Sequence, residues 1–135
     1  MSLFGAIDIS GTGVQAMQTW IDADAGNIAN ADDVVATSST PYAEQVAQLT
    51  PNTNTTTGGV GEGVDVSVTS STVGGVVEND PASPLADKSG NVLTPNISLG
   101  DQLVGMVQAQ EGYQADTSAI TRALTAYQAG LGIGS

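Results

Sequence analysis

Apolar residues recur at helical spacing at both ends of the chain, whereas the middle follows a different pattern. All five prolines lie between positions 41 and 95, so both ends are free of this helix breaker. The sequence therefore predicts an α+β fold. Long N- and C-terminal helices (residues 1–31 and 98–135) would pack as an antiparallel coiled-coil-like pair, with a small, mainly β or extended middle segment (32–97) between them.

The N-terminal helix carries a row of positions separated by alternating steps of three and four residues, the heptad spacing of packed helices. This row consists of Leu3, Ile7, Ser10, Val14, Met17, Ile21, Asp24 and Ile28. Several glycines in the same segment each weaken a helix by about 1 kcal/mol relative to alanine. The helix should therefore depend on packing for its order.

The C-terminal helix repeats this pattern without a slip. Its row consists of Leu99, Leu103, Met106, Gln110, Tyr113, Thr117, Ile120, Leu124, Tyr127 and Leu131. Ser98 is expected to cap the helix, and the glycines from Gly130 onward are expected to end it. Periodicity alone leaves two readings open: an ordinary two-helix core, or a coiled-coil assembly.

The middle segment shows strand and loop signals. Residues 50–59 are rich in Thr, Asn and Gly, and they predict a polar loop. Asp87–Gly90 predicts a turn. The pieces expected to be extended are 42–49, 64–68, 73–77 and 92–93.

The amino-acid composition excludes most kinds of catalytic site and several kinds of binding site. The chain has 135 residues, with 2 Lys or Arg, 14 Asp or Glu, and no His or Cys. Without His or Cys there is no imidazole or thiolate for catalysis or zinc binding. The net charge of −12 opposes binding to nucleic acid. No apolar run approaches the roughly 20 residues of a membrane span, and no signal peptide is expected.

The remaining candidate chemistry is weak, so we expect no enzyme, no metal site and no cofactor. Residues 58–66 resemble one calcium-binding β-roll repeat, but they lack its Asp and any tandem copy. Asp22, Asp24 and Asn27 mimic the start of an EF-hand loop, although a solvated helix face explains them better. Lys88–Ser89 could form a Ser–Lys dyad in principle, but the pair lies in a predicted turn. The carboxylate pairs Glu62/Asp65 and Glu78/Asp80 have no aromatic pocket nearby.

Four short blocks of the chain follow a recognisable order. They are residues 26–31, Pro41–Tyr42, residues 84–97 and residues 113–116. In this order they resemble the "SNLANA", "PY", "PLAD-x-x-GYV-x-x-PNV" and "YQAN" elements of the bacterial flagellar basal-body rod proteins, in particular the proximal-rod FlgC type. The block at 84–97 is the strongest of these matches. Its matched positions are Pro84, Leu85, Asp87, Gly90, Val92, Pro95 and Asn96.

The resemblance implies a structural subunit of the rod, the drive shaft that transmits motor torque for motility. It also implies that the terminal helices form an inner tube domain and that the middle segment forms a small outer domain. The positions expected at the assembly interface are Ile7, Val14, Met17, Ile21, Asn27, Ile28, Asn30, Leu103, Met106, Tyr113, Ile120, Leu124 and Tyr127.

The same resemblance implies the partners. They are copies of the chain, other rod subunits, membrane-ring and rod-adapter proteins at the base, and the flagellar type III export apparatus. The expected location is the basal body on the periplasmic side, reached without a cleaved signal peptide. The alternatives are another rod or hook protein, or a non-flagellar secreted coiled-coil or adhesin-like protein. The acidic surface would need either basic neighbours or screening by salt.

Overall fold

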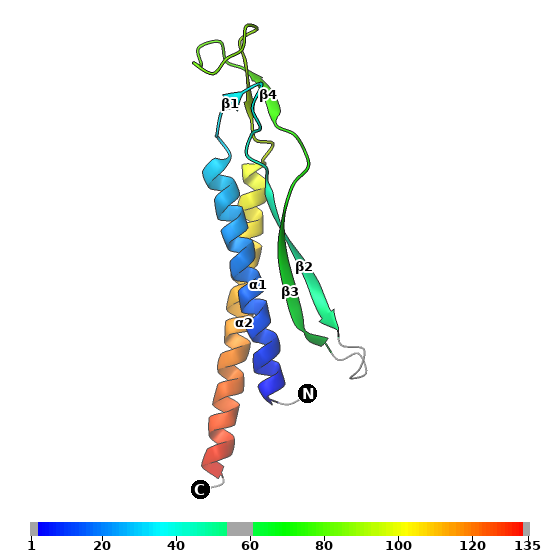
Figure 1. Cartoon of the computed structure of the whole chain (residues 1–135). Helices are drawn as coiled ribbons and strands as arrows, with labels where there is room; N and C mark the ends of the chain where they lie inside the picture. The colour runs from blue at the N-terminus through cyan, green and yellow to red at the C-terminus, as the bar shows by residue number, and fades with distance from the viewer. Residues whose placement is uncertain (1–2, 54–60, 134–135) are drawn as a thin grey trace.

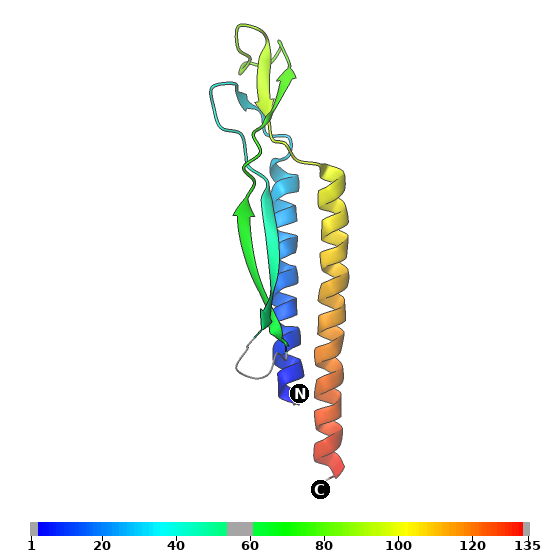
Figure 2. The ribbon, with the colours of Figure 1, turned by 90° about the vertical axis from the view of Figure 1, so that its right-hand side faces the viewer.

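The protein is built from two long helices with two small β elements at their side and end (Figures 1 and 2). The computed structural model describes residues 3–53 and 61–133. In chain order the elements are α1 (Leu3–Asn30), β1 (Val35–Ala36), β2 (Gln45–Thr53), β3 (Gly61–Ser70), β4 (Val76–Asn79), β5 (Asn91–Thr94) and α2 (Leu99–Ile133). The fold is of the α+β type that the sequence predicts.

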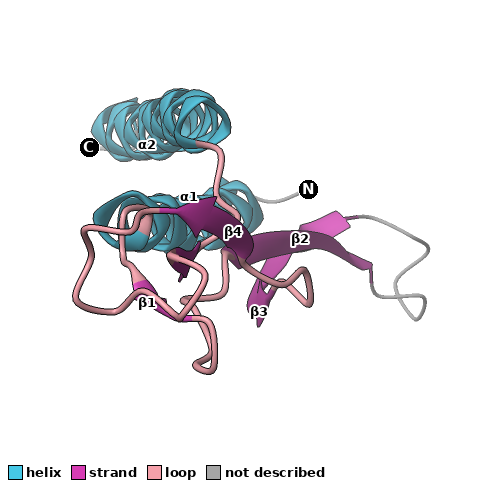
Figure 3. Cartoon of the chain, turned by 90° about the horizontal axis from the view of Figure 1, so that it is seen from above, coloured by secondary structure: helices cyan, strands magenta, loops and turns pink. Residues whose placement is uncertain are grey.

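The two helices lie side by side and run in opposite directions (Figure 1). Seen from above, α1 is the middle of three layers, with α2 on one side and the strands on the other (Figure 3). Ser98 caps α2 as predicted, because its hydroxyl accepts a hydrogen bond from the Asp101 amide at 3.3 Å. The predicted end of α2 at Gly130 is wrong, since the helix continues through Gly130 and Gly132 to Ile133.

Contacts between the helices keep a single antiparallel register. In order along α1 the pairs are Gly13–Asp116, Met17–Gly112, Asp24–Gly105 and Asn27–Gln102. Each step along α1 is matched by an equal step backwards along α2. Three of the four pairs place a glycine under a larger side chain: a Cβ at Gly112, for example, would lie 2.7 Å from Met17 Sδ. Glycine therefore allows the helices to approach closely.

The row predicted on α2 lies one residue away from the contact, whereas the row predicted on α1 supplies two of the contact residues, Met17 and Asp24. The buried positions of α2 are Gln102, Ala109 and Ala123, each beside a member of the predicted row. The buried positions of α1 are Gly13, Ala16, Ala23, Asp24 and Asn27. The helices thus pack largely through small and polar residues.

Strands β2 and β3 form a long antiparallel hairpin that runs back along α1 (Figure 2). Their register runs from Gln45 opposite Ser70 to Pro51 opposite Val64. The predicted loop at residues 50–59 is therefore wrong at its start, because residues 50–53 belong to β2. Its remainder, with the first part of the β-roll-like stretch, lies outside the described residues.

One side chain of α1 joins the far end of this hairpin to the helix. The Thr12 hydroxyl accepts a 3.0 Å hydrogen bond from the Val64 amide. Gly63 lies directly over Thr12 with a φ of +114°, where a Cβ would collide with the hydroxyl. Gly63, near the start of β3, thus provides a close backbone approach to the helix.

The second β element is a three-stranded antiparallel sheet in the order β1-β5-β4 at the end of the helix pair. Val92 on its central strand is only 1% exposed, which makes it the centre of a small local core. The predicted strand at residues 73–77 is displaced, because β4 begins at Val76. A Cβ at Gly75 would lie 2.6 Å from the Thr94 carbonyl oxygen, so this approach requires glycine.

Candidate assembly interface

Asn27 connects three elements where the two helices and the hairpin meet. Its Nδ2 donates to Gln102 Oε1 on α2 at 2.8 Å and to the Gln45 carbonyl on β2 at 2.7 Å. Its Oδ1 accepts from the Gln45 amide at 2.7 Å and from the Tyr42 hydroxyl at 3.4 Å. The side chain is fully buried. Asn27 therefore acts as an internal cross-link, and its expected place at an assembly interface stays a prediction.

Asp24 is buried one turn before Asn27 and is only 6% exposed. The interpretation of these two residues as a solvated helix face is therefore wrong, although Asp22 is exposed. The Oδ2 atom of Asp24 is buried and has no hydrogen-bond partner. Burial raises the pKa of this carboxyl above its ordinary value, while a hydrogen bond with Trp20 opposes the rise.

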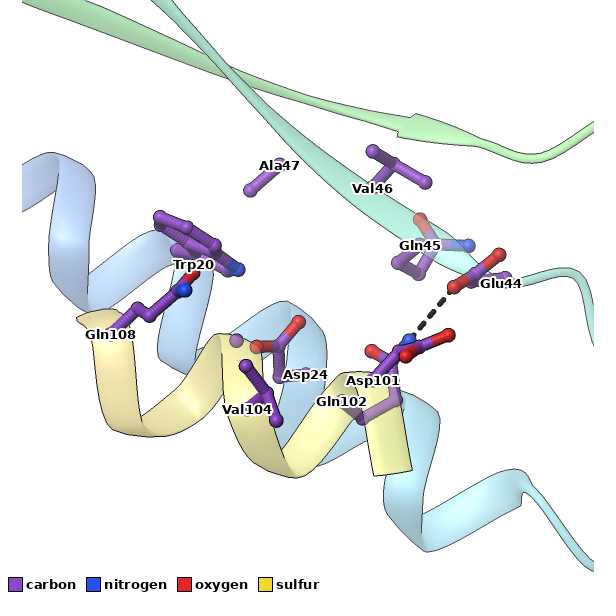
Figure 4. A pocket seen from close by; sticks show the side chains of 11 residues that line it. Trp20, Asp24, Glu44, Gln45, Val46, Ala47, Asp101, Gln102, Val104 and Gln108 are labelled. Carbon is purple, nitrogen blue, oxygen red and sulfur yellow. Dashed lines mark hydrogen bonds between the residues drawn. The ribbon is translucent and has the colours of Figure 1, made fainter. Parts of the chain in front are cut away.

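A pocket opens beside Asp24, between the two helices and the start of β2 (Figure 4). Gln102 Nε2 donates to Glu44 Oε1 across its end at 2.8 Å. The Glu44 charge also raises the pKa of Asp24. The residues that line the pocket are Trp20, Asp24, Glu44, Gln45, Val46, Ala47, Asp101, Gln102, Val104, Gly105 and Gln108.

Large apolar side chains remain exposed along α2. Leu103 is 56% exposed and Ile133 is 88% exposed. The others on this helix are Leu99, Val104, Val107, Leu124, Tyr127 and Leu131. We call these eight residues the α2 apolar row. They form two groups, one from Leu99 to Val107 and one from Leu124 to Ile133. Exposed apolar surface of this kind is typical of a surface that contacts another protein.

The remaining predicted interface residues fall into two groups. Leu103, Leu124 and Tyr127 belong to the exposed α2 apolar row, and Tyr127 stacks edge-on against Phe4 at 5.5 Å between ring centroids. The half-buried ones are Ile7, Val14, Met17, Ile21, Ile28, Asn30, Met106, Tyr113 and Ile120. Of these, Met17 contacts Gly112 across the helix pair, and Ile21 and Tyr113 line one pocket. The whole set lies on α1 and α2, and its place at an assembly interface stays a prediction.

The block at residues 84–97 forms a tight turn followed by β5. Asp87 Oδ1 accepts hydrogen bonds from the amides of Ser89 at 2.8 Å and Asn91 at 3.0 Å. The Asn91 bond and then the Ser89 bond lower the pKa of this carboxyl. Gly90 has a φ of +81°, a conformation that favours glycine. The predicted turn at 87–90 is confirmed.

The other members of that block have different surroundings. Val92 and Pro95 are buried, whereas Pro84, Leu85 and Asn96 are exposed. Thr37 donates to Asp87 Oδ2 at 3.2 Å and so joins this turn to the segment after β1. The block therefore builds the small sheet and leads the chain into α2.

Comparison with models of known protein families finds no match. Curated proteins do match, over nearly the whole chain. A flagellar basal-body rod protein FlgC from Salmonella typhimurium is 34% identical, and the match covers 86% of each chain. One from Escherichia coli is 31% identical over 89% of each chain. The chain belongs to the FlgC family of flagellar basal-body rod proteins.

A more distant FlgC, from Borreliella burgdorferi, is 29% identical and aligns over 98% of each chain. The whole length of the chain, helices and β elements together, is therefore shared with the family. These names agree with the resemblance drawn from residues 26–31 and 84–97. They give no support to the non-flagellar alternative.

Sequence patterns missed one residue of the helix contact and gave two interpretations of another. Gln102 is buried and bonds to both Asn27 and Glu44, whereas the predicted row of α2 passed through its neighbour Leu103. Asp24 belonged to the predicted row of α1 but was also interpreted as part of a solvated face. The detectable signal was Gly105, which follows Gln102 by three residues and makes room for Asp24.

Neither described helix is long and apolar enough to cross a membrane. Within residues 3–53 and 61–133, no three His, Cys, Asp or Glu side chains are grouped as a metal ion would require.

Proposed function

We propose that this chain is a structural subunit of the flagellar basal-body rod, where it assembles with other rod components. The α2 apolar row is the observation that carries this proposal. A lone molecule would expose these side chains to water, and a subunit in a stack would bury them. The names of the matched relatives supply the identity of the assembly.

The finer assignment is a proximal-rod position in the torque-transmitting shaft. In it, α1 and α2 form the inner tube domain as a coiled-coil-like pair, and residues 32–97 lie outside. The constant antiparallel register of the helix contacts supports a rigid pair of this kind. A rigid pair is suited to transmitting torque, since close-packed interiors deform little under load.

The proposed contacts are copies of the chain, other rod subunits and the membrane-ring and adapter proteins at the base. Export through the flagellar type III apparatus would deliver the chain to the periplasmic side as an unfolded polypeptide. The absence of cysteine suits this route, because no disulfide has to be made or broken. No catalytic step is part of the proposal.

Deletion of the gene and purification of basal bodies together test the proposal. A strain of the encoding bacterium that lacks the gene should fail to swim and should build no rod beyond the base. Swimming should return when the gene is restored, and the chain should co-purify with basal bodies. A deletion strain that swims normally, or basal bodies that lack the chain, would refute the proposal.

A further inference from the structure

The pocket beside Asp24 combines negative charge with apolar walls. Asp24, Glu44 and Asp101 contribute carboxyl groups, and Trp20, Val46 and Val104 contribute apolar surface (Figure 4). Its volume is about 350 Å³, against about 30 Å³ for a water molecule in the liquid. A long side chain from another molecule would fit within it.

Asp24 distinguishes this pocket from an ordinary acidic surface. A buried carboxylate with an unpartnered oxygen is expensive in a monomer, because it has lost water and gained no cation in return. Gly105 preserves the arrangement, since a Cβ there would lie 2.5 Å from Asp24 Oδ2. The described residues thus hold a costly charge in place with one carboxyl oxygen, Oδ2, lacking a hydrogen-bond partner.

The chemistry of the pocket suits a guanidinium or ammonium group on an apolar stem. Val46 and Val104 are each about half exposed at the rim, where they could contact the methylene groups of arginine or lysine. The Trp20 indole in the wall offers a face for a cation–π contact. The carboxyls are not grouped closely enough for a bare metal ion.

A copy of this chain is a poor source of that cation. The chain carries only two basic residues and a net charge of −12, so two copies repel each other. A subunit with a basic surface would be attracted instead. Charge complementarity therefore selects a different protein as the occupant.

We infer that this pocket receives an arginine or lysine side chain from a neighbouring, basic subunit of the rod, which pairs with Asp24 and Glu44. The inference rests on the proposed function and names the chemistry of one of its partners. It also accounts for part of the acidic charge, because one carboxyl cluster is then matched by a basic neighbour.

Photo-cross-linking in assembled basal bodies tests the inference. A benzoyl-phenylalanine replaces Val46 at the rim of the pocket, and a control strain carries it at Val77, an exposed position on β4. After irradiation, mass spectrometry identifies the cross-linked peptide. From Val46 we expect a peptide of another rod protein with an arginine or lysine within three residues of the cross-linked position.

Charge removal then tests the role of the carboxyl group. Asp24→Asn should lower the cross-link yield from Val46 by about tenfold, the loss expected when one charged hydrogen bond is removed. Asp22→Asn removes the same charge from an exposed site two residues away and should change the yield less than twofold. Glu44→Gln provides the comparison if Asp24→Asn fails to enter the rod.

Four results overturn the inference while leaving the proposed function intact. They are no cross-link from Val46, a cross-linked peptide without a basic residue, a cross-link to a copy of this chain, and equal yields from Asp24→Asn and Asp22→Asn. Absence of the wild-type chain from basal bodies would instead refute the proposed function, and the inference with it.

Discussion

Asn27 Nδ2 donates a 2.8 Å hydrogen bond to Gln102 Oε1, and this bond joins the C-terminal end of α1 to the N-terminal end of α2. The same asparagine also holds both backbone polar groups of Gln45. One buried side chain of the element at residues 26–31 thus fixes the helix pair and the hairpin relative to each other. This geometry gives that element a structural role.

Asn27→Ala should destabilise the chain strongly. The Gln45 amide and Gln102 Oε1 would lose a partner, and we expect a loss of about 2–4 kcal/mol because buried polar groups without partners are costly. Urea unfolding followed by circular dichroism measures the loss. Asn96→Ala, at an exposed site, should change the unfolding free energy by less than about 0.5 kcal/mol. Equal effects would contradict the internal role of Asn27.

Protonation of Asp24 should raise the unfolding free energy as the pH falls. Its pKa is raised by burial in the folded chain, so the folded state binds more protons than the unfolded state between the ordinary and the raised pKa. Stability at this site is therefore gained on acidification and lost as the pH rises through the folded pKa. Asp24→Asn should be more stable than wild type at pH 7.

The control is the difference in unfolding free energy between wild type and Asp24→Asn, measured across pH. The advantage of Asp24→Asn should shrink between pH 7 and pH 4, as wild-type Asp24 takes up its proton. A constant advantage would show that Asp24 is not the titrating group. Unfolding free energies from urea titrations at each pH provide the measurement.

Gly112 and Met17 should show strong energetic coupling. Alanine normally stabilises an exposed helix by about 0.5–1 kcal/mol relative to glycine, and Gly130→Ala should show this gain because nothing lies within 4 Å of its new Cβ. Gly112→Ala should instead destabilise the chain by about 1 kcal/mol through its clash with Met17.

A double-mutant cycle checks this contact. In a Met17→Ala chain the clash is gone, so Gly112→Ala should become stabilising. Thermal unfolding of the four chains gives the coupling energy. If Gly112→Ala has the same effect with and without Met17, the proposed register of the helices is incorrect.

Salt should stabilise the isolated chain. A net charge of −12 on 135 residues creates self-repulsion, which is screened as the Debye length falls from about 30 Å at 0.01 M salt to about 3 Å at 1 M. The unfolding midpoint should therefore rise over this range of sodium chloride concentration. A midpoint that stays constant would mean that the repulsion is balanced within the chain itself.

The α2 apolar row should be needed for assembly and dispensable for the fold. Leu103→Asp places a charge on a side chain that is already 56% exposed, so unfolding free energy should change by less than about 1 kcal/mol. Swimming in soft agar should nevertheless be lost. Val73→Asp, at a 61% exposed site before β4, is the matched control and should swim normally.

Helix periodicity predicted the long helices well, because proline-free ends and heptad spacing are strong local signals. It placed the contact row of α2 one residue away from the observed one, while Met17 and Asp24 of the row predicted on α1 do lie at the contact. The predicted row of α2 was chosen by the heptad spacing of its large apolar residues, whereas Gly105, Gly112 and Ala109 lie at the actual contact. Close helix approach depends on the absence of a side chain, which a hydrophobicity pattern does not register.

The sequence pattern also failed to predict which polar side chains are buried. Asp24 and Asn27 lie in an acidic stretch that suggests solvent, and only the fold shows that α2 and β2 close over them. The length of the β2–β3 hairpin was underestimated for a related reason. Residues 50–53 have loop-like chemistry, but their pairing with β3 supplies the ladder hydrogen bonds that make them a strand.

The rod assignment is best tested by a cryo-EM map of the basal body from the encoding bacterium. We expect density for the α1–α2 pair within the rod, with the α2 apolar row buried against a neighbouring subunit. Basal bodies whose rod contains no density for this chain, or in which that row faces solvent, would contradict it.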